Sequence, residues 1–270
     1  MDRKPYFAAA GIAATALLTL LPLRPALAYF DFVPTPTEWT AWPEYCRVQY
    51  SFIMKQQESE YAEAYTQVDW KNLESALGTK AFYGLHHFCA GLHWYTRSRN
   101  EPEPKKSRFM LNFALEETLF TYRSAEHTSI VYPDIAMSLA RIRRALGEPD
   151  QAIEVLEKGI REQPTRLMLY GALAVMYREQ KQVPRAKEVL LQADQISAGK
   201  SPEIQYNLGL INLELGNVDE AQANAARAYA MGYPLPGLKN KLQKIGKWPP
   251  PASLPQPAAG VADTAEVPKK

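Results

Sequence analysis

The sequence lacks the short motifs by which most enzyme families are recognised. It contains no GxSxG nucleophile elbow, no GxxxxGK[ST] phosphate loop, no GxGxxG dinucleotide fingerprint, no CxxC pair and no HExxH metal frame. Serine and carboxylate residues are plentiful, but no nucleophile is tied to a base at a defined spacing. We therefore expect no catalytic residues, no cofactor, no resident metal and no enzymatic activity.

The sequence also lacks an excess of either charge. The whole chain has a formal net charge of +2, but residues 1–28 hold three basic residues and one acidic residue, so the remainder has 28 of each. A basic isoelectric point that arises largely from the first 28 residues gives no support for a nucleic-acid partner or an anionic-membrane partner.

An apolar run long enough to cross a membrane is missing. The run from Phe7 to Leu21 follows two basic residues and precedes "PLRPALA", and it is shorter than the ~20 residues of a spanning helix. These features predict a secretory signal peptide over residues 1–28, cleaved after Ala28. We expect a periplasmic or secreted protein with no transmembrane segment after cleavage. An uncleaved anchor is the alternative, and no cysteine near Ala28 is available for a bacterial-type lipid anchor.

Cysteine is scarce, since the chain has only Cys46 and Cys89. In an oxidising compartment an isolated pair most simply forms a disulfide, so we predict a bond between them. A competing hypothesis is a metal or redox module, because His86, Cys89 and His93 share one face of a predicted helix. A metal would need a thiolate that an oxidising compartment tends to remove, so the disulfide is the preferred interpretation.

Large and small residues recur with a near-constant period between about Pro133 and Met231. Steps of 34 and 35 residues separate the equivalent positions, which are Leu139, Leu173 and Leu208, then Ala152, Ala186 and Ala221, then Gly159, Ala193 and Ala228. The turn sequences "GEPD" and "GNVD" end two of the three first helices, whereas Lys181 stands at the corresponding position of the middle unit. The small residues mark positions where two helices approach closely.

This pattern resembles the tetratricopeptide repeat family. The resemblance implies an all-α fold, a right-handed α-solenoid of helix hairpins that bury their apolar faces by stacking on neighbours. It also implies a protein-interaction scaffold or assembly factor of the bacterial cell envelope that binds a protein or peptide in its concave groove. The Lys and Asn set by which cytosolic co-chaperone members clamp a terminal carboxylate is not reproduced, so that function is not expected.

The family's inward positions project onto the first helix of each unit. They give Met137, Val175 and Leu210 and the candidate peptide-binding residues Arg141, Arg144, Arg178, Tyr206, Asn207 and Glu214. Three arginines on adjacent units favour a partner with an acidic segment or a chain terminus. The alternative for any single arginine is an ordinary solvated position.

The remaining stretches complete the predicted organisation. Residues 29–79 are expected to form an N-terminal arm, extended from Tyr29 to about Ala41, and a helical cap rich in aromatic residues. A ligand cradle or an enzyme site built from these aromatic residues is the minority hypothesis. We further expect a degenerate repeat-like helix pair at 80–132, three repeat units at 133–232, a capping helix at 233–247 through Leu238, Leu242 and Ile245, and a disordered proline-rich tail at 248–270.

Overall fold

The computed structural model describes residues 32–55 and 60–248. Within these ranges the chain forms twelve α-helices and no strand. Their bounds are α1 Pro36–Ala41, α2 Glu44–Met54, α3 Gln67–Leu77, α4 Thr79–Asn100, α5 Pro104–Ser124, α6 Tyr132–Leu146, α7 Pro149–Glu162, α8 Leu167–Glu179, α9 Val183–Ile196, α10 Pro202–Glu214, α11 Val218–Ala230 and α12 Gly237–Lys244. The predicted signal peptide and nearly all of the predicted tail lie outside the described residues.

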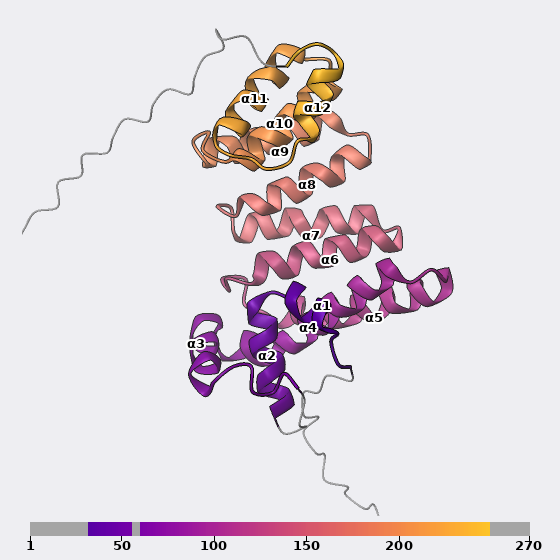
Figure 1. Cartoon of the computed structure of the whole chain (residues 1–270), viewed down its shortest axis with the longest axis vertical. Helices are drawn as coiled ribbons and strands as arrows, with labels where there is room; N and C mark the ends of the chain where they lie inside the picture. The colour runs from indigo at the N-terminus through magenta and orange to yellow at the C-terminus, as the bar shows by residue number, and fades with distance from the viewer. Residues whose placement is uncertain (1–31, 56–59, 249–270) are drawn as a thin grey trace, which may run out of the picture.

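The helices from α4 to α11 form four consecutive hairpins that stack along the long axis of the molecule (Figure 1). The short helices α1 to α3 lie at one end of the stack, and α12 covers the other end (Figure 1). The expected all-α solenoid is confirmed. None of the helices in the described ranges combines the length and the apolar character that a membrane crossing requires.

The repeated small residues lie where neighbouring helices touch. Ala152, Ala186 and Ala221 are completely buried, and the large residues one helix earlier, Leu139, Leu173 and Leu208, fill the space beside them. A Cβ atom added to Gly159 would lie 3.3 Å from the Leu169 side chain, which shows how close α7 and α8 come. The sequence period therefore reports a real spatial repeat, because equivalent residues pack in equivalent places.

The turns inside the three hairpins all use a left-handed residue after the first helix. Gly147 and Gly216 adopt φ values of 84° and 78°, and Lys181 takes the same conformation with φ 61°. The Gln182 N–H then donates to the Tyr177 carbonyl oxygen at 2.8 Å, as in a Schellman cap. The middle unit thus keeps the turn geometry of its neighbours. The left-handed backbone conformation is strained at Lys181, because its Cβ atom comes close to the following carbonyl oxygen.

Replacing Lys181 with glycine is expected to stabilise the protein by about 1 kcal/mol, because glycine tolerates a positive φ that costs other residues roughly 1–2 kcal/mol. Thermal or urea unfolding would measure the change. The matched control is Gln180→Gly, one residue earlier at φ −77°, which should destabilise the protein because no strain is relieved there. Equal effects of the two substitutions would contradict the strain argument.

The N-terminal cap differs from the expected extended arm. Residues 36–41 form α1, and the Thr35 side chain and Glu38 make a reciprocal capping box at its start. Pro36 occupies the first helical position, where its missing N–H costs nothing. The expectation of an extended segment as far as Ala41 was therefore wrong, because the two prolines precede or begin a helix instead of preventing one.

The C-terminal cap is a short helix laid over the last hairpin. Leu238 and Leu242 of α12 are fully buried against a cluster that includes Ala225 and Ala228 of α11. Ile245, expected on the same face, follows the end of α12 and is half exposed. The prediction was wrong for Ile245, because the helix ends before its side chain could be carried onto the covered face.

Candidate peptide groove and disulfide-linked cap

A shallow cleft lies between the first helices of the second and third units, α8 and α10. At Gly171 of α8 an added Cβ atom would make only an ordinary contact of 3.5 Å with the Glu203 carboxylate of α10, so the floor of the cleft here is open backbone. The cleft is lined by Gly171, Ala174, Val175 and Arg178 of α8, Leu190 of α9, and Asn207, Leu210 and Ile211 of α10. Two of the predicted groove residues, Arg178 and Asn207, therefore line the same cleft.

Two of the predicted arginines are engaged in ion pairs between successive units. Arg144 lies 3.4 Å from Glu179, and Arg178 donates through Nε to Glu214 at 2.6 Å. The Glu214 hydrogen bond raises the pKa of Arg178 above its ordinary value. The pairs recur at equivalent positions, each joining one first helix to the next. These arginines therefore connect neighbouring units, and Arg178 also lines the cleft.

Arg141 and Tyr206 have different surroundings from those two arginines. Arg141 is exposed and has no ion pair among the described residues. Tyr206 is buried, with its ring 4.4 Å from the ring of Tyr233, and its hydroxyl would obstruct any side chain at Gly237. Tyr206 was predicted to face a ligand, but it belongs to the C-terminal cap, because the segment leading into α12 covers it. We correct that assignment.

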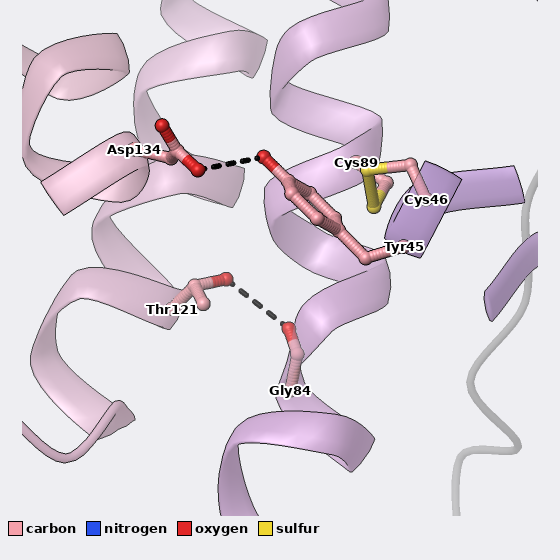
Figure 2. Close-up of a disulfide and its surroundings, with 6 residues drawn as sticks. All are labelled: Tyr45, Cys46, Gly84, Cys89, Thr121 and Asp134. Atoms are coloured by element: carbon pink, nitrogen blue, oxygen red, sulfur yellow. Dashed lines mark hydrogen bonds between the residues drawn. A yellow bond between two sulfur atoms is a disulfide. The ribbon is translucent and has the colours of Figure 1, made fainter. Parts of the chain in front are cut away.

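The cysteines lie at the contact between the cap and the first hairpin. Cys46 of α2 and Cys89 of α4 form a disulfide with Cα atoms 5.5 Å apart, as Figure 2 shows. Beside it, the Tyr45 hydroxyl donates to the Asp134 carboxylate of α6 at 3.3 Å. Burial raises the pKa of Asp134, while this hydrogen bond and Arg141 oppose the shift. One cap helix is thus tied to both α4 and α6.

The aromatic residues of the cap pack on one another. The Phe32 ring stacks on His93 at 3.5 Å, and Trp42 and Tyr50 meet it edge-on or tilted. Burial lowers the pKa of His93, with the nearby Arg97 charge acting in the same direction. Arg97 donates to Glu38 at 2.8 Å and holds the pKa of that carboxyl below its ordinary value. This packing favours a structural core over the aromatic cradle of the minority hypothesis.

The structure does not gather the residues of the metal hypothesis around one point. Cys89 is in the disulfide, His93 is stacked on Phe32, and His86 Nδ1 lies 2.8 Å from the Tyr83 carbonyl oxygen. Within the described ranges no group of three or more His, Cys, Asp or Glu side chains has a metal-binding arrangement. The geometry therefore gives no support to a metal or redox centre at this position.

Sequence reasoning missed one close polar pair. His87 of α4 lies 2.6 Å from the Glu117 carboxylate of α5, and the Phe120 ring lies 4.0 Å from its imidazole. Together with Glu116 and Arg123 these residues line an open hollow on the hairpin. No sequence signal identified the pair, because its members are 30 residues apart and become neighbours only when α4 and α5 pair.

Comparison with known families agrees with this geometry. Models described as tetratricopeptide repeat match residues 133–176 and residues 202–231. The chain is therefore an all-α repeat protein. It contains tetratricopeptide repeats in these two stretches. The stretch between the two matches contains α9 and the strained turn at Lys181.

Comparison with individual proteins adds less. None of the curated proteins with which the chain was compared matches it. Among solved structures, one similar chain is YrrB, described as a TPR protein with an unusual peptide-binding site. The similarity covers 73% of this chain and 90% of that one, with 12% identity and a TM-score of 0.46. At that distance no residue role is transferred.

Proposed function

We propose that the protein is a non-catalytic scaffold of the bacterial cell envelope that holds an extended peptide segment of a partner protein in the cleft between α8 and α10. The observation that carries the proposal is the composition of that cleft. Val175 and Leu210 supply apolar surface, and the Asn207 side chain makes no hydrogen bond within the described residues. An asparagine amide can both donate to and accept from the backbone of an extended ligand.

The ion pairs bear on the kind of peptide that the cleft would accept. An acidic segment, which the three arginines favour in the sequence, would have to displace Glu179 from Arg144 and Glu214 from Arg178. Arg141 alone of the three is without such a competitor among the described residues. We therefore propose recognition through an apolar side chain seated at Val175 and Leu210, with backbone hydrogen bonds to Asn207. A carboxylate near Arg141 would add to this binding.

The envelope location in this proposal rests on the sequence of residues 1–28, which has the features of a secretory signal. Its direct test is the N-terminal sequence of the protein recovered from the periplasmic fraction. A first residue at Tyr29 supports export and cleavage. Retention of residues 1–28 on a membrane-bound protein would favour the uncleaved anchor, and recovery only from the cytoplasm would refute export.

The groove itself can be tested by site-specific photo-crosslinking in the native cell. A photoreactive residue at Val175 is expected to capture a discrete partner, and the same residue at Leu191 is expected to capture none. Leu191 is a matched control because it is 44% exposed against 37% for Val175 and lies on α9 of the same unit. Equal capture from both positions, or none from Val175, would remove the groove from the proposal.

The captured partner then provides a binding assay. Val175→Glu is expected to weaken its binding at least tenfold, because a charge would be placed in the apolar part of the cleft, and Leu191→Glu should leave binding unchanged. Unfolding temperatures that match the wild type would show that both variants are folded. Charge reversal of Arg144 and Arg178 is a poorer test, because it also breaks the ion pairs between units.

A further inference from the structure

The hairpin of α4 and α5 projects from the side of the solenoid. Its helices contain 22 and 21 residues, whereas the helices α6 to α11 contain 13 to 15. Figure 1 shows the joined ends of α4 and α5 reaching beyond the neighbouring hairpins. We call residues 99–113 the hairpin tip. Side chains there can meet a flat surface that the rest of the stack would not touch.

Two phenylalanine rings are exposed at the hairpin tip. Phe109 is 66% exposed and Phe113 is 39% exposed, and their ring centroids lie 6.3 Å apart on successive turns of α5. The Trp94 ring of α4 lies 5.4 Å from Phe113 and continues the aromatic surface inward. A single exposed apolar residue needs no explanation, but adjoining aromatic residues on a projection indicate a contact surface.

The same tip carries an excess of positive charge. Its basic residues are Arg99, Lys105, Lys106 and Arg108, and its acidic residues are Glu101 and Glu103. Glu103 pairs with Lys106 at 2.8 Å, and Glu101 accepts the backbone N–H of Glu103. Within the described residues Arg99, Lys105 and Arg108 have no ion-pair partner. The rings are thus bordered by cations that would complement an anionic surface.

The aromatic contacts of Trp94 also reach the buried core of the N-terminal cap. The Phe32 ring lies 6.1 Å from the Trp94 ring, so Trp94 stands between Phe32 and Phe113.

We propose that the hairpin tip is a peripheral membrane contact that binds anionic phospholipid surfaces. Phe109 and Phe113 enter the interface between headgroups and acyl chains, where amphipathic and aromatic side chains are stabilised. Lys105 and Arg108 contact the anionic headgroups from the first turns of α5. The contact would hold a scaffold at the membrane while leaving the cleft between α8 and α10 open to its partner.

The test is co-sedimentation with vesicles of equal parts phosphatidylglycerol and phosphatidylcholine, compared with vesicles of phosphatidylcholine alone. The protein used begins at Tyr29, because every contact described above lies within residues 32–248 and the apolar run would otherwise bind lipid itself. We expect binding to the mixed vesicles only. Replacing both Phe109 and Phe113 with serine should weaken it at least tenfold, and Lys105→Gln with Arg108→Gln should weaken it roughly fivefold per cation.

Phe120→Ser is the matched control. Phe120 follows Phe113 by seven residues on α5 and is 52% exposed, but it lies outside the hairpin tip, and its neighbours include the carboxylates Glu116 and Glu117 beside the single cation Arg123. This variant should bind vesicles like the wild type. All variants change exposed side chains, and unchanged unfolding temperatures would confirm that they fold.

Three outcomes would overturn the proposal. They are no binding to the mixed vesicles, equal binding to both vesicle types, and a loss with Phe120→Ser as large as that with the Phe109 and Phe113 pair. The first would leave a protein partner as the explanation of the exposed rings, and it can be checked by photo-crosslinking from Phe109. None of these results would alter the expected crosslinks at Val175, so the membrane proposal and the groove proposal fail separately.

Discussion

Removing the Cys46–Cys89 disulfide is expected to destabilise the N-terminal cap by about 4 kcal/mol, the chain-entropy value for a bond that closes a loop of 43 residues. Alanine is the suitable replacement at both positions. Both cysteines are fully buried, and serine would leave buried hydroxyl groups in need of partners. The cost should be large because α1, α2 and α3 are short, and because α2 and α3 have only each other and α4 as their main helix neighbours.

Native-state hydrogen exchange would locate the effect. Protection should fall in α2 and in the part of α4 around Cys89, while α8 to α11 keep theirs, because repeat units contact mainly their neighbours. The control is wild-type protein in reductant, which should lose the same protection, whereas the double alanine variant should not respond to reductant. Two free thiols in the untreated protein, found by alkylation and mass measurement, would contradict the predicted bond.

The solenoid could be predicted from the sequence because a pattern of large and small residues that repeats at a fixed step indicates the same helix packing in each unit. Each unit places a large residue such as Leu173 and a small residue such as Ala186 at the same steps, and one arrangement satisfies all copies at once. The residue types at individual turns predicted the fold less well than the repeated packing pattern did. Lys181 weakened the sequence signal for the middle turn, yet its neighbours impose the left-handed conformation on it.

The candidate site was only partly predictable. Family positions projected Arg178 and Asn207 onto the groove, and these two residues line a common cleft between α8 and α10. The same projection could not show that the segment leading into α12 covers Tyr206, or that Glu179 and Glu214 take up two of the arginines. These contacts depend on which segments of the folded chain lie next to each helix face. The spacing of residues along one helix does not give that information.

The cap shows the same limit in another way. The prolines of residues 34–36 suggested an extended arm, but the capping box of Thr35 and Glu38 starts a helix directly after them. Likewise, the pairing of His87 with Glu117 and of Tyr45 with Asp134 joins residues 30 and 89 positions apart. Pairs of this kind follow from tertiary packing, so a single sequence offers no spacing rule for them.

Gly91→Ala is expected to destabilise the first hairpin by roughly 1–3 kcal/mol, although alanine is the better helix former. An added Cβ atom at Gly91 would overlap the Thr118 hydroxyl oxygen and would lie 3.2 Å from the Ala114 carbonyl oxygen and 3.3 Å from the Thr118 nitrogen. Thr118 is fully buried and α4 and α5 share a long contact, so neither side chain nor backbone can yield without disturbing the packing.

Gly84→Ala provides the opposite expectation in the same helix. Its added Cβ atom would meet only the Ser124 hydroxyl oxygen, at an ordinary 3.6 Å, and its carbonyl oxygen would still accept the Thr121 hydroxyl at 3.1 Å (Figure 2). That variant should gain about 0.5–1 kcal/mol from helix propensity. Urea unfolding of both variants would compare the two signs directly.

Thr118→Ala in the Gly91→Ala background identifies the cause of the loss. Removing the hydroxyl deletes the worst overlap but leaves the two backbone contacts, so it should recover part of the lost stability and not all of it. A loss at Gly91 that Thr118→Ala leaves unchanged would assign the cost to backbone separation of α4 and α5. A gain in stability at both glycines would show that the two helices are farther apart than the structure places them.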